Sequence, residues 1–441
     1  MPNCRAKVRR LKAANPRDAT AKGRQRDETT GPRREMADQT LARYVNELNV
    51  LTLLRIKGAT SRASLSRQLA LTPATMSRLV GEMARRGLLR ETLDAAPGAN
   101  SRSPGRPGVE IGIDPGGAYF LGVEIGVGIV RFCLLDLAAA PIDTAEANVA
   151  TDIAPTAVVR LIARHFAKLR RLPRFTGKIR AVGVTVPGLV TLDGDVVHLP
   201  ILGWRDINLR ARLSEAVGLP CFVENNATAA AFGAVYTQPA LQSDCAIFLK
   251  LGAGCGGAAI VNGRLLRGAA GTAGEFGHMR IAGGGRLCHC GQRGCLETMV
   301  NLDAMARLYK RDAGGDPAHI QLPQAIARAA RLGDPSARAA IASLARHLGL
   351  GLVTLANVFN PSVIVLGGIM RPVIELCLDK LRTNVAERIV PGALVPDIRM
   401  SALGIFECAV GAAAVAHHHS FDIANFDFSQ RELAFSPPVA Q

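Results

Sequence analysis

The sequence predicts an α/β protein in which a small helical N-terminal module precedes a larger body of two related lobes. Helical periodicity begins near Leu41, a strand, glycine turn, strand pattern occurs twice beyond Val109, and positive charge is concentrated in the first quarter of the chain. A chain of 441 residues is also too long for one ordinary hydrophobic core. We therefore expect two or three domains.

The formal net charge of +17 is unevenly distributed. Residues 1–110 hold 22 Lys/Arg and 10 Asp/Glu, which leaves only +5 for the remaining 331 residues. A local excess of this kind favours contact of the N-terminal quarter with a polyanion. A solvated basic tail is the alternative for residues 1–40, which are polar, lack aromatic residues and are expected to form a disordered arm. It does not account for the segment that follows.

Composition also restricts the compartment. The chain has no apolar run of about 18 residues, and its Arg/Lys-rich N-terminus lacks the apolar stretch of a secretory signal. Most of the ten cysteines are scattered through apolar runs, as ordinary buried thiols are. A reducing compartment suits this usage. These features predict a cytoplasmic protein with no membrane contact and no disulfides.

Residues 41–110 carry the pattern of a winged helix-turn-helix. Apolar residues at three-residue steps predict a first helix that Gly58 ends. A cap at Thr60 or Ser61 starts a second helix, and a third is expected over Ala74–Arg86. The third helix is the expected recognition helix, because the later helix of such a pair enters the major groove. The candidate DNA-binding residues at its N-terminal end are Thr72, Thr75, Ser77 and Arg78.

A wing is expected next, from a strand beginning at Gly87 and a Gly/Ser/Pro-rich loop over Pro97–Arg106. The loop carries Arg102 and Arg106, and an arginine held between Gly and Pro can enter a narrow A·T-rich minor groove. A helical packing module with a solvated loop is the alternative. The coincidence of basic charge, turn and wing favours DNA binding.

Beyond Val109 a pattern of strand, Gly-rich turn and strand occurs twice. Strands over Tyr119–Ile125 and Ile129–Leu137 flank a Gly-rich turn, and a second strand pair flanks the Gly-rich segment 252–257. Such repetition is typical of an actin-like nucleotide fold, in which Gly-rich hairpins contact phosphates from both lobes. The glycines alone are weak support, because tight hairpins need glycine whether or not a ligand binds.

One cluster has the spacing of metal ligands. Three of the ten cysteines fall within eight residues, close after a histidine. Thiolate and imidazole ligands suit a four-coordinate structural Zn²⁺ site, and the short spacings close it at little entropic cost. Reduced cysteines in a turn are the alternative, but the crowding favours zinc. The predicted ligands are His278, Cys288, Cys290 and Cys295.

From about Leu51 to Ala416 the chain resembles the ROK (repressor, open reading frame, kinase) family, in its transcriptional-regulator branch. The matching segments occur in order: GRPG at 105–108, VEIG at 123–126, GVTVPGLV at 183–190, LGW at 202–204, VENNATAAA at 223–231, GAGCGG at 252–257, GEFGH at 274–278, the cysteine cluster with Glu297, NPSVIVLGG at 360–368 and AVGAAA at 409–414.

The resemblance implies a two-lobed actin-like (ribonuclease H-like) domain over residues 111–420, followed by a tail at 421–441. It also implies zinc on the His/Cys cluster and a sugar-type ligand between the lobes, held by Asn225, Glu275, His278 and Glu297, with Asn226 beside them. Carboxylates, an amide and an imidazole together can satisfy several sugar hydroxyls. Each carboxylate alone is equally explained as a surface charge or a helix cap. Zinc would preorganise the loop that carries the ligand residues.

Several positions depart from the kinases of the family, whose general base is an Asp after the Asn of an E-N-D motif. That position is Asn226, and an amide cannot accept the proton, which is typically worth ~10²–10⁴ in rate. The Asp-x-Gly-Gly-Thr phosphate loop reads Glu124 to Gly128, and Ala253 replaces a Thr. Ile201 and Thr228 replace polar residues of the family, so the specificity pocket is altered, and a less polar effector in place of a sugar is the alternative.

We therefore expect a DNA-binding regulator, a repressor rather than an enzyme, controlled by a sugar or sugar phosphate. Half-site spacing favours a homodimer or homotetramer on a palindromic operator of double-stranded DNA. An active sugar kinase with an appended DNA-binding module, and a DNA-binding scaffold that senses no ligand, remain open. The tract His417 to His419 is expected to be exposed, and the role of the aromatic residues after it, Phe421, Phe426, Phe428 and Phe435, stays open.

Overall fold

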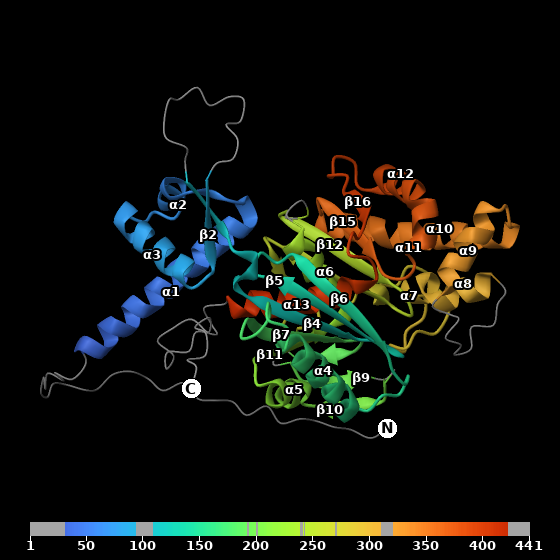
Figure 1. Cartoon of the computed structure of the whole chain (residues 1–441). Helices are drawn as coiled ribbons and strands as arrows, with labels where there is room; N and C mark the ends of the chain where they lie inside the picture. Colours follow the sequence, from blue (N-terminus) through green and yellow to red (C-terminus); the bar gives the residue numbers. More distant parts are fainter. Residues whose placement is uncertain are drawn as a thin grey trace, which may run out of the picture.

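The structure is a computed structural model that describes residues 31–93, 109–191, 194–199, 202–238, 241, 243–269, 271–309 and 321–421. A helical module with a small sheet lies beside a body of two lobes (Figure 1). The α/β class, the winged module and the two-lobed body that the sequence predicts are all confirmed.

The N-terminal module is a winged helix. It comprises α1 (Gly31–Lys57), β1 (Thr60–Ser61), α2 (Arg62–Gln68), α3 (Pro73–Arg85), β2 (Leu89–Leu93) and β3 (Val109–Ile113), with sheet order β1-β3-β2. Gly58 follows α1 with φ 82°, a left-handed conformation that glycine adopts at little cost. The Ser61 side chain caps α2 by accepting from the Ser64 N–H, and Thr72 caps α3 in the same way.

The start of the first helix differs from the sequence expectation. Helix α1 begins at Gly31, so the last ten residues of the expected disordered arm are helical instead. After Pro32, which suits a first helical turn, no glycine or proline interrupts the chain before Gly58, and propensity carries the helix further than the apolar stripe indicates. The rest of the expected arm, residues 1–30, lies outside the described residues.

The first lobe contains a five-stranded sheet of order β11-β7-β4-β5-β6. Alternate side chains of β4 face opposite sides: Leu121 and Val123 belong to the core formed with α4 and α5, whereas Phe120 belongs to the core formed with α6 and α13. The sheet is therefore covered on both faces. The elements are β4 (Tyr119–Ile125), β5 (Ile129–Asp136), β6 (Pro141–Asn148), α4 (Pro155–Arg170), β7 (Ile179–Val186), α5 (Leu209–Val217), β11 (Cys221–Asn225) and α6 (Asn226–Thr237), with a side sheet of β8 (Leu189–Val190), β9 (Val196–Leu199) and β10 (Trp204–Ile207).

The second lobe repeats this topology, with sheet order β14-β13-β12-β15-β16. In both sheets an antiparallel three-strand meander is followed by two strands that add in parallel beside its first strand. The predicted internal repeat is thereby confirmed. The elements are β12 (Cys245–Leu251), β13 (Cys255–Val261), β14 (Arg264–Leu265), α7 (Glu297–Val300), α8 (Leu302–Leu308), α9 (Leu322–Arg331), α10 (Pro335–Phe359), β15 (Val363–Gly367), α11 (Arg371–Ile374), α12 (Leu378–Arg388) and β16 (Asp397–Met400).

Helix α13 (Glu407–Ser420) packs with α6 between the two sheets (Figure 1). Glycines allow this close packing. A Cβ added at Gly122 of β4 would lie 2.0 Å from the Ala409 carbonyl oxygen, and one at Gly183 of β7 would lie 1.8 Å from the Ala412 carbonyl oxygen. No side chain fits at either position, so these strands accept the helix only with glycine.

The histidine tract is part of α13, and the expectation that it is exposed is wrong for its first member. His417 is 3% exposed, with Nε2 2.9 Å from the Leu137 carbonyl oxygen and Nδ1 2.8 Å from the Tyr236 hydroxyl. The apolar residues 408–416 before it are all buried, and the tract continues their helix into the core. His418 is exposed at the helix surface.

The winged module and the first lobe share one hydrophobic core. Leu51 and Leu54 of α1 and Leu88 belong to the same cluster of buried residues as Phe120 of β4 and Ala413 of α13. The Asp114 N–H donates to the Leu88 carbonyl at 2.9 Å across the junction. Packing therefore couples the position of the module to the body.

Within the described residues one helix, α10, is long and apolar enough to cross a membrane. The apolar side chains of its inner face, including Leu344, Leu348 and Leu352, are buried in the core of the second lobe, whereas Leu350 and Val358 are exposed. A core helix of a globular lobe explains its composition.

Candidate functional site

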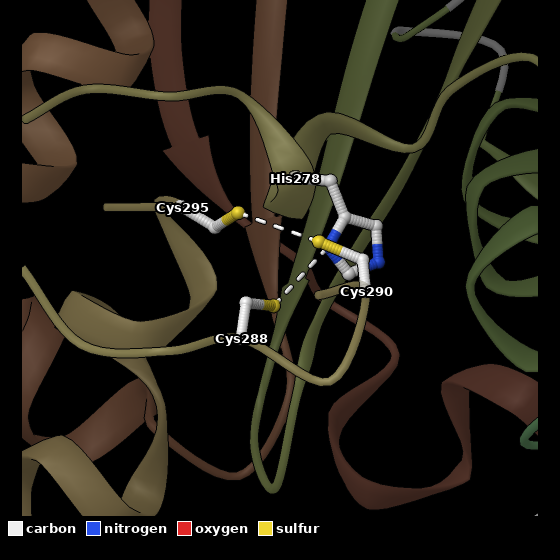
Figure 2. A group of neighbouring side chains, drawn as sticks. All are labelled: His278, Cys288, Cys290 and Cys295. Carbon is white, nitrogen blue, oxygen red and sulfur yellow. Dashed lines mark hydrogen bonds between the residues drawn. The ribbon is translucent and has the colours of Figure 1, made fainter. Parts of the chain in front are cut away.

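The predicted metal ligands come together in the second lobe (Figure 2). One ligand atom from each of the four residues lies within 4.8 Å of all the others. The Sγ atoms of Cys290 and Cys295 are 3.6 Å apart, and Cys288 Sγ lies 3.4 Å from His278 Nδ1. Tetrahedral zinc with bonds of about 2.3 Å to sulfur requires separations of about 3.8 Å. The donor set and the spacing thus fit a metal ion.

Tight turns bring the cysteines together. The Cys288 N–H donates to the Gln292 carbonyl at 2.8 Å. The backbones of Arg280 and Cys295 form an isolated antiparallel β-bridge. Gly294 adopts φ 79°, and a Cβ there would lie 2.3 Å from the Ala282 carbonyl oxygen, so the turn before Cys295 needs glycine. A hydrogen bond from the Gln292 backbone lowers the pKa of the Cys290 thiol, whereas burial raises that of Cys288 to about 12. A bound cation would hold all three as thiolates.

His278 has two differently placed ring nitrogens. Nδ1 faces the sulfur cluster, and Nε2 lies 3.7 Å from a carboxylate oxygen of Glu275. Glu275 itself is exposed, with 56% of its side chain accessible. A histidine that binds metal through Nδ1 keeps its Nε2 edge for a ligand or for the carboxylate.

Glu297, at the start of α7, connects the metal cluster to the Gly-rich loop of the second lobe. Its Oε2 accepts a hydrogen bond from the Cys255 N–H at 2.9 Å, and its Oε1 accepts from the Cys288 thiol at 3.7 Å. A Cβ at Gly254 would lie 2.8 Å from Oε2, so glycine is needed for the loop to approach this carboxylate. The cluster and the carboxylate therefore hold each other in place.

Asn225 and Asn226 lie where β11 meets α6, on the first lobe. The Asn225 Oδ1 accepts from the N–H groups of Ala227 and Thr228, and its Nδ2 donates to the Gly188 carbonyl at 2.9 Å. The Asn225 side chain is thus a helix cap in this state. Asn226 is 7% exposed, and its buried Oδ1 has no hydrogen-bond partner among the described residues.

The two lobes meet beside these amides. A Cβ at Gly256 of β13 would lie 2.6 Å from the Ala227 Cβ, so the start of α6 touches the Gly-rich strand of the second lobe. An ion pair joins Arg267, after β14, to Glu224 of β11 at 2.8 Å. The sequence reasoning missed this pair, because 43 residues separate its members and no local pattern marks it.

In the two loops that depart from the phosphate-binding sequences of the kinases, polar groups bond within the protein. Glu124 is 5% exposed and pairs with Arg131 at 3.2 Å, and the Ala253 carbonyl accepts from the Asn301 side chain. Thr228, one of the altered sugar-pocket positions, is half-buried in the first turn of α6. Ile201 lies outside the described residues.

The candidate DNA-contacting residues lie at the start of α3. Ser77 and Arg78 are exposed, whereas Met76, Leu79, Val80 and Met83 point into the core of the module. Thr72 Oγ1 accepts from the Thr75 N–H at 3.2 Å and lies 2.9 Å from Thr75 Oγ1. Thr72 is therefore a helix cap as well as a surface hydroxyl. Arg102 and Arg106 lie outside the described residues.

A buried ion pair fixes this helix, and the sequence reasoning missed it too. Glu47 of α1 has 2% of its side chain exposed, and both of its carboxylate oxygens accept from the Arg86 guanidinium at 3.0 Å. Arg43 adds a third donor at 3.1 Å. The bidentate geometry sets the end of α3 against α1.

A winged helix joined to a two-lobed body, with an interlobe set of amides and carboxylates, is the architecture of a ligand-responsive DNA-binding regulator. The sequence model of the ROK family matches residues 120–419, and the chain belongs to that family. The family resemblance that the sequence motifs indicate is thus confirmed.

Known proteins of two kinds are similar to this chain. The xylose repressor of Bacillus spizizenii is 29% identical over 88% of this chain and 99% of its own length. A crystal structure described as a ROK family transcriptional regulator, homolog of the E. coli MLC protein, is 25% identical, has a TM-score of 0.71, and covers 89% of this chain and 99% of its own. A ROK family glucokinase from Streptomyces griseus, in complex with glucose and AMPPNP, is 32% identical with a TM-score of 0.58, over 68% of this chain and 100% of its own.

Proposed function

We propose that this protein is a transcriptional repressor of sugar uptake or metabolism genes, which binds operator DNA through α3 and its wing and responds to a sugar between the lobes. The observation that carries the proposal is the match to a xylose repressor over 99% of that protein's length, which includes the winged module. Glucokinases cover only about two thirds of this chain. A pentose or hexose, free or phosphorylated, is the effector class that these relatives favour.

The interlobe chemistry supports binding without phosphoryl transfer. Asn226 offers a buried amide oxygen that lacks a partner, and a sugar hydroxyl can donate to it. An amide does not take the proton of that hydroxyl, so general-base catalysis is lost. Glu124, at the altered phosphate loop, is neutralised by Arg131 rather than directed at a ligand. We infer that the protein is not an enzyme.

We further propose that the metal is zinc and that its role is structural. Three thiolates and one imidazole are a preferred donor set for closed zinc sites. His278, Cys288, Cys290 and Cys295 would hold the ion. Zinc bound there fixes the His278 ring and, because Glu297 follows the ligand Cys295 by two residues, the start of α7 that carries the Glu297 carboxylate. Its contribution is the orientation of ligand-binding groups.

Sugar binding would be transmitted through the shared core. Closure of the lobes displaces α6 and α13 relative to the sheets, and both helices pack in the core that contains α1 of the winged module. A homodimer or homotetramer in the cytoplasm would then change the spacing of paired recognition helices on a palindromic operator.

Gel-shift titration with promoter fragments from the neighbouring genes tests the repressor. We expect specific retardation at nanomolar to micromolar protein, released by one sugar from a panel of pentoses, hexoses and their phosphates. Release by no sugar would favour a scaffold that senses no ligand, and the absence of any specific fragment would contradict the proposal.

The similarity to glucokinases makes the active kinase the second candidate. A coupled ADP-release assay with the same sugars decides it. We expect no sugar-dependent turnover from the natural chain, and Asn226→Asp supplies the matched variant in which a carboxylate is restored. Turnover by the natural chain that Asn226→Ala abolishes would make the protein a kinase.

A further inference from the structure

A cavity of about 460 Å³ lies at the junction between the winged module and the body, away from the metal cluster and the interlobe amides. Most of its lining comes from α1, α6, α13 and the segment around Phe421, from the residues just before β12, and from β13 and the turn that follows it. Its volume is within the range of small-molecule sites, roughly 300–1,000 Å³. We call it the junction pocket; its lining includes Thr52, Arg55, Phe232, Tyr236, Ser243 and His418.

Aromatic rings make up much of the wall. Phe232 and Tyr236 of α6 are stacked with centroids 5.0 Å apart, and His418 of α13 lies edge-on to both. Phe421 adds a further ring at the end of α13. Phe232 and Tyr236 turn their faces to each other and Tyr236 also to Arg55, so their edges are left for a ligand. An aromatic ring packs well against such edges, whereas the hydroxyls of a sugar would be left without partners.

Two polar groups line the pocket. The Arg55 guanidinium lies 4.0 Å from the centroid of the Tyr236 ring and donates one N–H to the Tyr236 carbonyl at 3.0 Å, which leaves further donors of its planar fork. The Ser243 Oγ is buried and has no hydrogen-bond partner among the described residues. A carboxylate accepts from both a guanidinium and a hydroxyl, and its charge complements that of Arg55.

Two other titratable residues of the lining, His417 and Asp244, have little effect on a carboxylate bound beside Arg55. His417 is buried, and burial lowers the pKa of His417 to about 3, so it adds no charge to the lining. Asp244 is exposed at the rim, where water and salt screen its charge. Arg55 thus sets the charge of the interior.

We propose that the junction pocket is a second small-molecule site, and that it takes a planar aromatic ring bearing one carboxylate. The ring would pack against the edges of Tyr236 and Phe232, with the carboxylate on Arg55 and Ser243. Arg55 and Thr52 belong to the winged module and the other segments to the body. A molecule bound here therefore fixes α1 against α6 and α13 and alters operator affinity, a consequence that rests on the proposed function, whereas binding itself does not.

Calorimetric titration of the full chain tests the site with benzoate, 4-hydroxybenzoate and phenylacetate as probes. We expect saturable one-to-one binding of at least one acid at millimolar concentration or below. The matching neutral amide, and cyclohexanecarboxylate, which keeps the charge without the aromatic ring, should bind about tenfold more weakly or worse. No binding of any acid, or equal binding of acid, amide and cyclohexanecarboxylate, would overturn the proposal.

Three variants locate the binding. Arg55→Gln should remove the preference for acid over amide, while Lys57→Gln, two residues further along α1, should keep it. Thr52→Trp places an indole in the pocket from a position that is exposed on α1, and should abolish binding with little change in melting temperature. Undiminished affinity in Thr52→Trp would place the molecule elsewhere. Binding that persists in a protein without operator activity would support the pocket and refute the repressor.

Discussion

The guanidinium of Arg267 lies 2.8 Å from the carboxylate of Glu224, and this ion pair joins the two lobes directly beside Asn225 and Asn226. Glu224 has 11% of its side chain exposed, and its second oxygen accepts from the Asn225 N–H at 2.9 Å. The carboxylate thus ties the amide-bearing end of β11 to the second lobe.

Replacement of Arg267 by Met keeps much of the length of the side chain and removes its charge. We expect a loss of about 1–3 kcal/mol in the free energy of unfolding, because a buried carboxylate is left with an incomplete set of donors. Sugar affinity should fall as well, since the end of β11 is less firmly held. Urea denaturation and calorimetry measure the two effects, with Arg264→Met on β14 as control. If Arg267→Met and Arg264→Met have the same stability and sugar affinity, the ion pair between Arg267 and Glu224 does not hold the lobes together.

Replacement of Cys290 by Ser should release the metal. A hydroxyl is a poor ligand for zinc at neutral pH, and the site then keeps three donors. Elemental analysis is expected to give about one zinc per natural chain and almost none for the variant, whose response to sugar should vanish. Cys245→Ser, remote from the cluster, should retain the ion. A metal-free chain that still responds to sugar would refute the orienting role.

Replacement of Arg78 by Ala should weaken operator binding and lower the slope of log affinity against log salt by about one unit, if Arg78 contacts a phosphate. Arg106→Ala should act in the same direction from the wing. Arg328→Ala, an exposed arginine of α9, removes the same charge far from α3 and should bind like the natural protein. Unchanged binding by both DNA-side variants would refute the assignment of recognition helix and wing.

Replacement of Glu47 by Ala leaves the Arg86 guanidinium facing a gap, and Arg86 has only 20% of its side chain exposed. Loss of one partner of a buried pair typically costs about 3–5 kcal/mol, so the winged module should unfold at distinctly lower denaturant. Glu91→Ala breaks the pair with Arg62, whose members are both more than 40% exposed, and should cost no more than about 1 kcal/mol. Chemical denaturation followed by circular dichroism compares the two.

His417 should make stability depend on pH. Burial lowers the pKa of His417 from 6.5 to about 3. Between these values the unfolded chain binds a proton that the folded chain does not, so the free energy of unfolding decreases as pH falls below 6.5, by about 1.4 kcal/mol per unit. His417→Gln should reduce this slope. A slope unaffected by His417→Gln would show that other groups cause it.

The sequence predicts features that depend on local spacing. A helix cap at Thr60 or Ser61, the end of α1 at Gly58, the two Gly-rich hairpins and the cysteine cluster each follow from residues a few positions apart. The structure confirms all four, with Ser61 as the cap. Spacing fixes these features because the chain between their parts is too short to adopt many arrangements.

Other features depend on which elements meet, and local patterns do not encode this. Glu47 and Arg86 are 39 residues apart, and each alone has the pattern of a solvated charge. His417 is misassigned for a related reason: a run of histidines has the composition of an exposed segment, and only the packing of α13 between two sheets places its first member in the core. The start of α1 is missed because its first turns carry no apolar stripe.

The placement of α13 constrains how the protein is made. Ala409, Ala413 and Ala416 complete the core that supports the winged module, although α13 is synthesised long after that module leaves the ribosome. In a nascent chain, the winged module therefore packs against an incomplete hydrophobic core. A translation product that stops before α13 keeps this core incomplete. Full-length chains should consequently bind the operator, and chains truncated before α13 should not.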